Sequence, residues 1–163
     1  LNCRYHTFII SKISCNFVGN PFKTNSMERI TVKSKVNSPS NKVWDLWTDP
    51  KHIVKWNTAS EDRHTTKAEN DLRVGGKFMS RMEAKDGRCG FDFGGTYDLV
   101  ATYTKIAYTM DDERKAEVTF NQNNGETEIV TVFDAESQNS IEMQRNGWQA
   151  ILDNFKKYAE GFQ

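Results

Sequence analysis

Few side chains in this sequence have the type and spacing that catalysis or metal binding requires. His52 and His64 are the histidines that follow residue 27, and neither has a Cys, Asp or Glu at a repeated metal-ligand spacing. Cys89 has no neighbouring base in the sequence that would activate its thiol. No serine lies in a GxSxG turn, and the HExxH pattern is absent. We therefore expect His52 at a helix end or on the surface and His64 in a solvated loop, with no catalytic residue, no metal site and no cofactor.

Two further patterns are explained most simply as turns. Gly75-Gly76 and Gly94-Gly95 resemble phosphate-binding loops, but neither pair opens a helix, which such a loop needs. The acidic run 111–113 (DDE) carries the charge that a hard cation would require, yet Arg114 and Lys115 follow it directly. A solvated hairpin connection is the favoured interpretation of that run.

What is left is a set of apolar and amphipathic side chains that could line a pocket. Tyrosine and tryptophan offer a flat apolar face with one polar tip that orients a ligand, and methionine adapts its shape. The simpler alternative is that each of these side chains only fills the core. Arg81 alternates away from two of them and is expected on the surface. The candidate ligand-binding residues are Phe78, Met82, Phe93, Tyr97, Tyr108, Phe120, Met143 and Trp148.

One long amphipathic helix is predicted from residue 139 to residue 163. Its apolar residues recur at spacings of three, four and seven, which places them on one stripe of the helix. Asn139 and Glu142 resemble a capping box at the first turn. A helix of about 22 residues is roughly 33 Å long, enough to cross a sheet. The apolar stripe holds Ile141, Trp148, Ile151, Leu152, Phe155, Ala159 and Phe162, and the wet side holds Gln144, Gln149, Asp153, Lys156, Lys157 and Glu160.

The rest of the chain is dominated by strands. Ile30, Val32 and Val36 alternate with polar residues and predict a first strand. Ser38 as N-cap and Pro39 at the first helical position predict a short helix, and Asp49-Pro50 predict a second one. From residue 65 the period is two, with glycine and aspartate turns between segments that pair as antiparallel hairpins. The expected strands are 65–72, 77–85, 91–100, 104–110, 115–121 and 127–134.

This order of elements predicts an α+β fold with one curved antiparallel sheet. The terminal helix alone is long enough to cover the apolar face of a seven-stranded sheet, and the two short helices would plug one end. A straight helix and a curved sheet diverge away from their line of contact. We therefore expect a cavity between them, and function is to be sought there.

Composition limits the classes of protein. A chain of 163 residues with 37% apolar content supports one domain. Its 22 basic and 22 acidic residues cancel, so no nucleic-acid partner is expected. Cys3, Cys15 and Cys89 are odd in number and widely spaced, which argues against a disulfide framework and favours a cytoplasmic location. No apolar run is long enough for a membrane span.

Residues 1–26 differ from the remainder, because they contain Arg4, Lys12 and Lys23 but no acid. Three interpretations stay open: a leader read from upstream of a start at Met27, a basic targeting peptide, or a disordered extension. The expected division is an extension over residues 1–26 and one folded domain over residues 27–163.

Several motifs between residue 27 and residue 162 resemble those of a known superfamily. They are Val43-Trp44, the Asp49-Pro50 turn ahead of Trp56, and the stretches 71–78 (DLRVGGKF), 95–99 (GTYDL) and 144–155 (QRNGWQAILDNF). Together they resemble the START-like (SRPBCC, Bet v allergen-like) superfamily, and within it the branch named after the C-terminal domain of the activator of the heat-shock-protein-ninety ATPase. The resemblance implies a helix-grip fold with a cavity between the long helix and the sheet.

Three functions are compatible with that resemblance. The first is binding of a hydrophobic or aromatic small molecule, such as a lipid, in the cavity. The second is an enzyme of the cyclase or hydrolase kind that uses the same cavity to orient a flexible substrate. The third is an interaction module with a chaperone partner. A homodimer is compatible with all three.

Overall fold

The computed structural model describes residues 28–162, and the extension expected over residues 1–26 lies outside them. The elements alternate as the sequence predicts, with two short helices after the first strand and one long helix at the end. In chain order they are β1 (Arg29–Val36), α1 (Ser40–Thr48), α2 (Pro50–Trp56), β2 (Arg63–Asn70), β3 (Lys77–Ala84), β4 (Gly90–Ala101), β5 (Lys105–Met110), β6 (Lys115–Asn123), β7 (Glu126–Asp134) and α3 (Ile141–Gly161).

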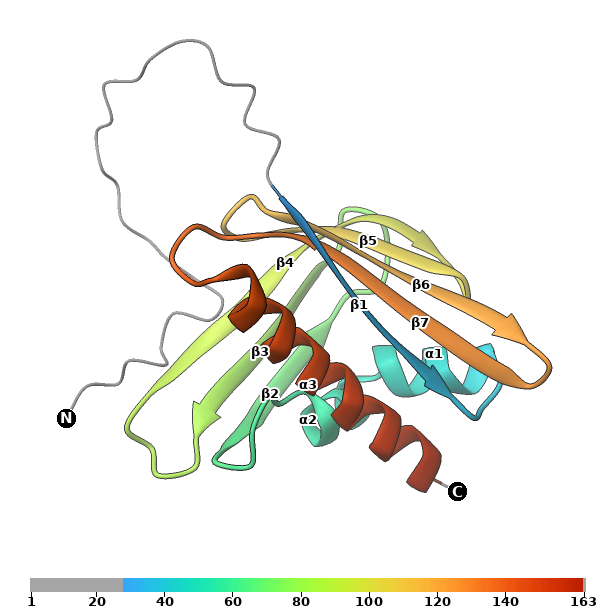
Figure 1. The fold of residues 1–163 in the computed structure, drawn as a ribbon, viewed down its shortest axis with the longest axis horizontal. Helices are drawn as coiled ribbons and strands as arrows, with labels where there is room; N and C mark the ends of the chain where they lie inside the picture. Colours follow the sequence, from blue (N-terminus) through green and yellow to red (C-terminus); the bar gives the residue numbers. More distant parts are fainter. Residues whose placement is uncertain (1–27, 163) are drawn as a thin grey trace, which may run out of the picture.

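The strands form one antiparallel sheet of seven in the order β1-β7-β6-β5-β4-β3-β2. Strands β2 to β7 pair with their neighbours in the chain, and β1 joins the sheet beside β7. The sheet curls, and α3 crosses its concave side while α1 and α2 lie at one end (Figure 1). The predicted α+β helix-grip architecture is confirmed.

The predicted bounds of the strand after α2 were wrong by two residues at each end. It was expected over 65–72, but β2 begins at Arg63 and ends at Asn70. The chain turns directly afterwards, where the Arg73 N–H donates to the Asp71 carbonyl at 2.8 Å. Leu72 therefore belongs to the connection between β2 and β3. Its apolar side chain continues the alternation of the strand, and alternation does not mark where a turn begins.

Two helix starts also differ from the prediction. The N-cap of α1 is Pro39 rather than Ser38, and it has no side-chain capping bond. The carbonyl of Ser38 instead accepts a bond from Thr127 Oγ1 at 2.7 Å. The N-cap of α3 is Ser140 rather than Asn139, since Ser140 Oγ accepts from the Met143 N–H at 3.1 Å. Asn139 lies one residue earlier and donates its amide to Glu136.

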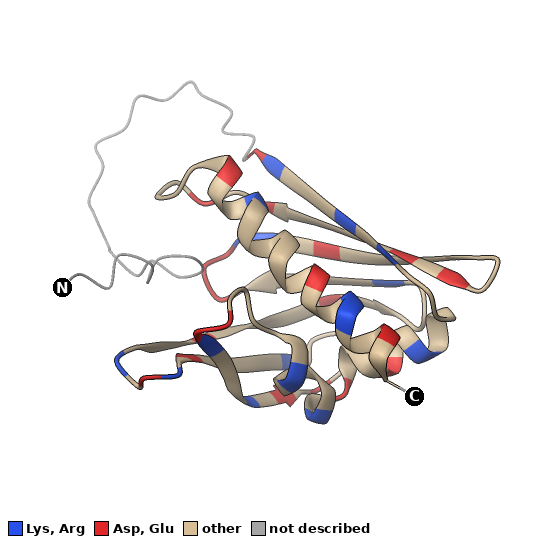
Figure 2. Cartoon of the chain, turned by 60° about the horizontal axis from the view of Figure 1, so that its bottom comes forward, with Lys and Arg blue, Asp and Glu red and all other residues tan. Residues whose placement is uncertain are grey.

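Two residues of the C-terminal segment do not lie where the amphipathic pattern predicts. Gln144, expected on the wet side, is 1% exposed, and its amide bonds the backbone of Glu136 and Asn139. Phe162, expected on the apolar stripe, follows the end of the helix and is 39% exposed. The remaining outward face of α3 carries interspersed acidic and basic side chains (Figure 2).

The long helix also closes one edge of the sheet. Gln149 accepts a bond from the Lys33 N–H at 3.3 Å and donates to the Lys33 carbonyl at 3.1 Å. Glu160 accepts from the Asn37 N–H at 3.0 Å. An unpaired strand edge invites association with other chains, so these contacts both hold α3 along β1 and block that edge.

Candidate functional site

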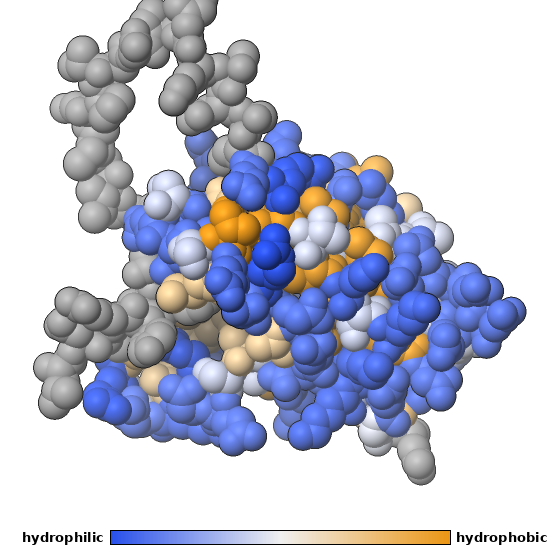
Figure 3. Space-filling view, in the orientation of Figure 1, coloured by the Kyte–Doolittle hydropathy of each residue, from blue (hydrophilic) through white to orange (hydrophobic). Residues whose placement is uncertain are grey.

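The path of α3 leaves part of the concave sheet uncovered. The helix packs along β1 and touches α1 and α2, while β2 packs against α2. The strands β3 and β4 therefore diverge from α3. Asn154 of α3 bridges to the loop after α2, since its amide donates to the Thr58 carbonyl at 2.6 Å. Apolar surface lies beside α3 over this part of the sheet (Figure 3).

A cavity of about 110 Å³ lies in that space. One water needs about 10–15 Å³ measured in this way, so the cavity has room for a guest larger than a water molecule. Its wall comes from the two short helices, five strands and α3. The lining residues are Trp47, Ile53, Trp56, Asn57, Glu69, Phe78, Ser80, Met82, Phe93, Tyr97, Ile106, Tyr108, Thr131, Trp148, Ile151 and Leu152.

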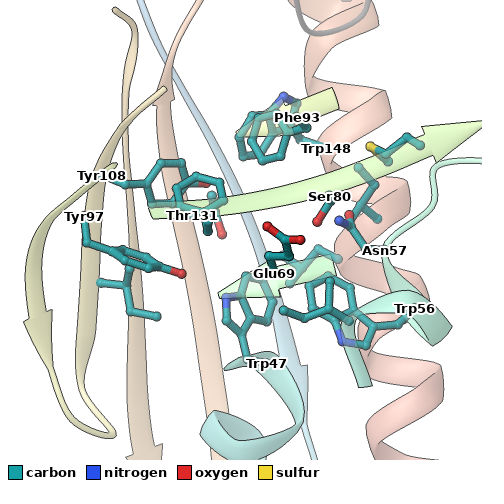
Figure 4. A pocket seen from close by; sticks show the side chains of 16 residues that line it. Trp47, Trp56, Asn57, Glu69, Ser80, Phe93, Tyr97, Tyr108, Thr131 and Trp148 are labelled. Carbon is teal, nitrogen blue, oxygen red and sulfur yellow. The ribbon is translucent and has the colours of Figure 1, made fainter. Parts of the chain in front are cut away.

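Six of the eight candidate residues from the sequence lie in this wall: Phe78, Met82, Phe93, Tyr97, Tyr108 and Trp148. They come together because each occupies an inward position on its strand or helix. Figure 4 shows Tyr97 and Tyr108 on one side of the cavity and Trp148 on the side next to α3.

The other two candidates lie elsewhere. Phe120 is 3% exposed, and its ring packs edge to face against Trp44 and Trp47 at 5.4 and 5.7 Å between centroids. Met143 is 41% exposed on the first turn of α3. Phe120 is thus a core residue behind the short helices, and Met143 is a surface residue.

Sequence reasoning missed several members of the wall. Trp47 and Trp56 come from the two short helices, whose apolar residues had been expected only to plug the sheet; their rings lie 4.9 Å apart. Thr131 and Ser80 are polar residues at inward strand positions. The signal for Thr131 was its place between Ile129 and Phe133 in an otherwise apolar inward row.

The aromatic side chains of the wall contact one another in a continuous group. The ring of Phe78 lies 5.8 Å from Phe93, 5.1 Å from Tyr97 and 4.9 Å from Tyr108. Trp148 stacks on Phe133 below the wall and meets the edge of Phe93 at 6.2 Å. Such contacts hold the rings in fixed orientations and leave their free faces toward the cavity.

The two tyrosines are held in the protonated state by burial. Burial raises the pKa of both the Tyr97 and the Tyr108 phenol well above the ordinary value, and the hydrogen bond from Tyr97 to Asn70 offsets this only in part. The Tyr97 hydroxyl donates to Asn70 Oδ1 at 2.8 Å, and Asn70 donates in turn to the Thr48 carbonyl at 2.6 Å. Both tyrosines therefore act as neutral hydrogen-bonding groups.

Ionisable groups other than the tyrosines are sparse in the wall. Within the described part of the chain, Glu69 is the single carboxylate of the wall; its side chain is 59% exposed and pairs with Lys67 at 2.6 Å. His52 lies outside the wall, with Nδ1 2.7 Å from the Tyr158 hydroxyl. Between residues 28 and 162, no three His, Cys, Asp or Glu side chains come together in a group that would hold a metal ion. No helix in that range is long and apolar enough to cross a membrane.

The family to which the chain belongs follows from a comparison with known families. Residues 37–160 match the model of the family described as activator of Hsp90 ATPase homolog 1-like protein. The chain belongs to this family. The match covers both short helices, strands β2 to β7 and nearly all of α3, and β1 directly precedes it.

Solved structures similar to this chain have the same fold. The AHSA1-like protein from Aeromonas hydrophila is 44% identical, with a TM-score of 0.78 over 82% of this chain and 92% of that one. A protein from Cytophaga hutchinsonii is 48% identical, with a TM-score of 0.72 over 81% of this chain and 92% of that one. A protein from Chromobacterium violaceum, 23% identical with a TM-score of 0.74 over 82% and 98%, shares the fold. No curated protein matches the chain.

Proposed function

We propose that this protein binds a hydrophobic or aromatic small molecule in the cavity between α3 and the sheet. The observation that supports this best is the wall itself, in which rings from α1, α2, β3, β4, β5 and α3 surround a space of about 110 Å³. Ligand sites are concave and mainly apolar, with a few polar groups that orient the ligand. The odd number of cysteines supports a cytoplasmic location for this activity.

A cavity-filling variant tests the proposal. Ser80 is 5% exposed and lies in the wall, so Ser80→Met would place a longer side chain inside the cavity. Thr96→Met is the matched control, because Thr96 neighbours Tyr97 on β4 and points to the opposite face of the sheet. Ligand-observed NMR with a library of lipids and aromatic compounds measures binding to each variant.

We expect the wild type and Thr96→Met to bind one or more of the same compounds and Ser80→Met to bind them at least tenfold more weakly. A library in which no compound binds the wild type would contradict the proposal. Equal binding by Ser80→Met would do so as well, because it would place the ligand on the outer surface. The amide spectrum of each variant reports whether it is folded.

A second candidate function is catalysis in the same cavity, and the observation that favours it is Glu69. This carboxylate is the ionisable acid of the wall and stands at the part of it that is open to solvent. A cyclase-like enzyme would use such a group as a general base beside a bound substrate. If Glu69→Gln retained binding of a library compound but abolished its conversion, the enzyme would be favoured over simple binding.

A third candidate rests on the family description, which names an activator of the Hsp90 ATPase. In this role the protein would use its outer surface rather than its cavity. Among the residues that the structure describes, the exposed large apolar side chains are Val74, Leu99, Tyr103, Met143 and Phe162. A change in the ATPase rate of purified chaperone on addition of this protein, unaltered by Ser80→Met, would favour that role.

A further inference from the structure

Three hydroxyl groups in the cavity wall have no hydrogen-bond partner within residues 28–162. They belong to Ser80, Tyr108 and Thr131, which are 5, 9 and 3% exposed. Every fully buried polar side-chain atom in that range does have a partner, so these hydroxyls are not sealed in the core but open on the cavity. Hydroxyls that open on such a space can bond water, and a guest that displaces the water must offer a partner in its place. A guest without one would leave the hydroxyls unpaired, which is unfavourable by an amount comparable to a lost hydrogen bond.

The hydroxyls of Tyr97 and Tyr108, on neighbouring strands, differ in their hydrogen bonding. Tyr97 and Tyr108 face each other across β4 and β5, with ring centroids 6.4 Å apart and ring planes at 90°. The Tyr97 hydroxyl already donates to Asn70 at 2.8 Å. The Tyr108 hydroxyl makes no such bond, so it is the phenol that is free to donate to a guest. In Figure 4 Thr131 stands on the same side of the cavity as Tyr108, and Ser80 stands nearer to α3.

The charge of the wall limits the guest further. Among residues 28–162, none that lines the cavity is Lys, Arg or His. The one carboxylate, Glu69, is already paired with Lys67. An anionic group that entered this space would lose its hydration without gaining a cationic partner, which is strongly unfavourable. Fatty acids and aromatic acids are therefore poor matches for the interior.

Size and shape favour a small flat molecule. A dry cavity of about 150 Å³ lined by aliphatic and aromatic residues is enough to hold benzene. The cavity here is of the same order, about 110 Å³, and it opens to solvent near Glu69, so the part of a guest that it encloses is about the size of one small aromatic molecule. The rings of Phe78, Phe93 and Trp148 offer faces and edges for it.

We infer that the cavity takes an uncharged aromatic molecule that carries a carbonyl oxygen, and that the Tyr108 hydroxyl donates a hydrogen bond to this oxygen. The inference rests on the proposed binding function and specifies its ligand class. Ser80 and Thr131 supply further hydroxyls for a second polar substituent. The aromatic ring lies among Phe78, Phe93 and Trp148.

Three probes of nearly equal shape separate the contribution of the hydrogen bond to binding from those of the apolar contacts and of charge. Acetophenone is neutral and has the carbonyl, α-methylstyrene replaces the carbonyl oxygen by a CH₂ group, and benzoate is anionic. Their dissociation constants are measured by titration of amide chemical shifts in the wild type, in Tyr108→Phe and in the control Tyr97→Phe. Acetophenone labelled with ¹³C at the carbonyl provides an independent readout in the wild type.

We expect Tyr108→Phe to weaken acetophenone about three- to tenfold and to leave α-methylstyrene unchanged, as the loss of one net hydrogen bond predicts. Tyr97→Phe leaves the ratio between these two probes unchanged, and benzoate binds the wild type at least tenfold more weakly than acetophenone. The carbonyl ¹³C resonance of bound acetophenone stays near its value in water, where it also accepts hydrogen bonds.

Other outcomes overturn the inference. They are equal effects of Tyr108→Phe on acetophenone and α-methylstyrene, benzoate binding as tight as that of acetophenone, or an upfield carbonyl shift toward the value in a hydrocarbon solvent. The last readout needs no variant, so an upfield shift overturns the inference even if Tyr108→Phe does not fold. Loss of the inference in this way leaves cavity binding intact, whereas failure of all three probes and of the wider library removes the proposed function itself.

Discussion

The indole of Trp148 on α3 stacks on the ring of Phe133 on β7, with 4.0 Å between centroids and 12° between planes. Phe133 is fully buried, whereas Trp148 is partly buried and also lines the cavity. One side chain thus joins the long helix to the sheet and forms part of the candidate site.

Replacement of Trp148 should therefore affect both stability and binding. Replacement of a fully buried tryptophan by alanine lowers the unfolding free energy by about 3–5 kcal/mol. Because Trp148 is partly exposed, we expect Trp148→Ala to lower it by about 2–3 kcal/mol. Met143→Ala, at an exposed position on the same helix, should change the unfolding free energy by less than about 0.5 kcal/mol. Urea unfolding measures both, and equal effects at the two positions would show that the stack does not hold the helix.

Gly95 should tolerate no side chain. A Cβ at this position would lie 2.4 Å from the Thr109 carbonyl oxygen and 3.0 Å from the Met110 Cα, both of which are backbone atoms of the paired strand. We expect Gly95→Ala to lower the unfolding free energy by about 1–3 kcal/mol. Gly161→Ala is the control, since nothing lies within 4 Å of its Cβ and alanine favours helix; it should be neutral or stabilising by up to about 1 kcal/mol. Thermal unfolding should give a lower midpoint for Gly95→Ala and an equal or higher one for Gly161→Ala, and an unchanged midpoint for Gly95→Ala would contradict the expectation.

Arg114 should be important for stability although it is charged. Its side chain is 7% exposed, bonds Asp112 at 2.8 Å and donates to the Asp134 carbonyl at 3.2 Å. Removal by Arg114→Ala leaves the Asp112 carboxylate, whose side chain is 17% exposed, without its partner. Loss of one partner of a buried pair typically lowers stability by about 3–5 kcal/mol, and the partial exposure of Asp112 places the expected effect at the lower end of that range. Arg88→Ala breaks the exposed pair with Asp86 and should lower it by less than about 1 kcal/mol. Chemical denaturation distinguishes the two, and a small effect at Arg114 would mean that water replaces its bonds.

The buried tyrosines should make the protein sensitive to alkali. Burial raises the pKa of Tyr97 and Tyr108 in the folded state, whereas the unfolded chain loses these protons near pH 10. The folded state thus binds more protons than the unfolded state above about pH 10, so the stability due to these groups is complete below that pH and falls as the pH rises above it. The double variant Tyr97→Phe, Tyr108→Phe should lose less unfolding free energy between pH 9 and pH 11 than the wild type does. Tyrosinate absorbance at 295 nm follows the same groups, and ionisation of both phenols before unfolding would contradict the expectation.

The fold could be predicted because its signals are local and repeated. The spacing of Trp148, Leu152 and Phe155 identifies the face of α3, and alternation in rows such as Ile129, Thr131 and Phe133 identifies the inward face of each strand. The exceptions occur where a polar side chain has a tertiary partner. Gln144 was expected in water because of its type, but its amide satisfies the backbone of the loop before α3 and is therefore buried.

The candidate site could be predicted only in part, because membership of the cavity wall depends on how elements pack. Phe120 and Tyr108 both point inward, yet Trp44 and Trp47 of α1 cover Phe120 and leave Tyr108 open. Periodicity assigns both residues to the same face and does not locate the short helix above them. The hydroxyls of Ser80 and Thr131 were missed for a related reason, since a polar residue in an apolar row acquires meaning only when the space beside it is known.

Two methionines of β3 test directly whether a guest enters the space under α3. Met82 is 4% exposed and lines the cavity, while Met79 lies on the opposite face of the same strand. With ¹³C-labelled methionine methyl groups and saturating acetophenone, we predict intermolecular NOEs from the guest to the Met82 methyl and none to the Met79 methyl. NOEs to Met79 alone, or to neither methyl at saturation, would contradict the account.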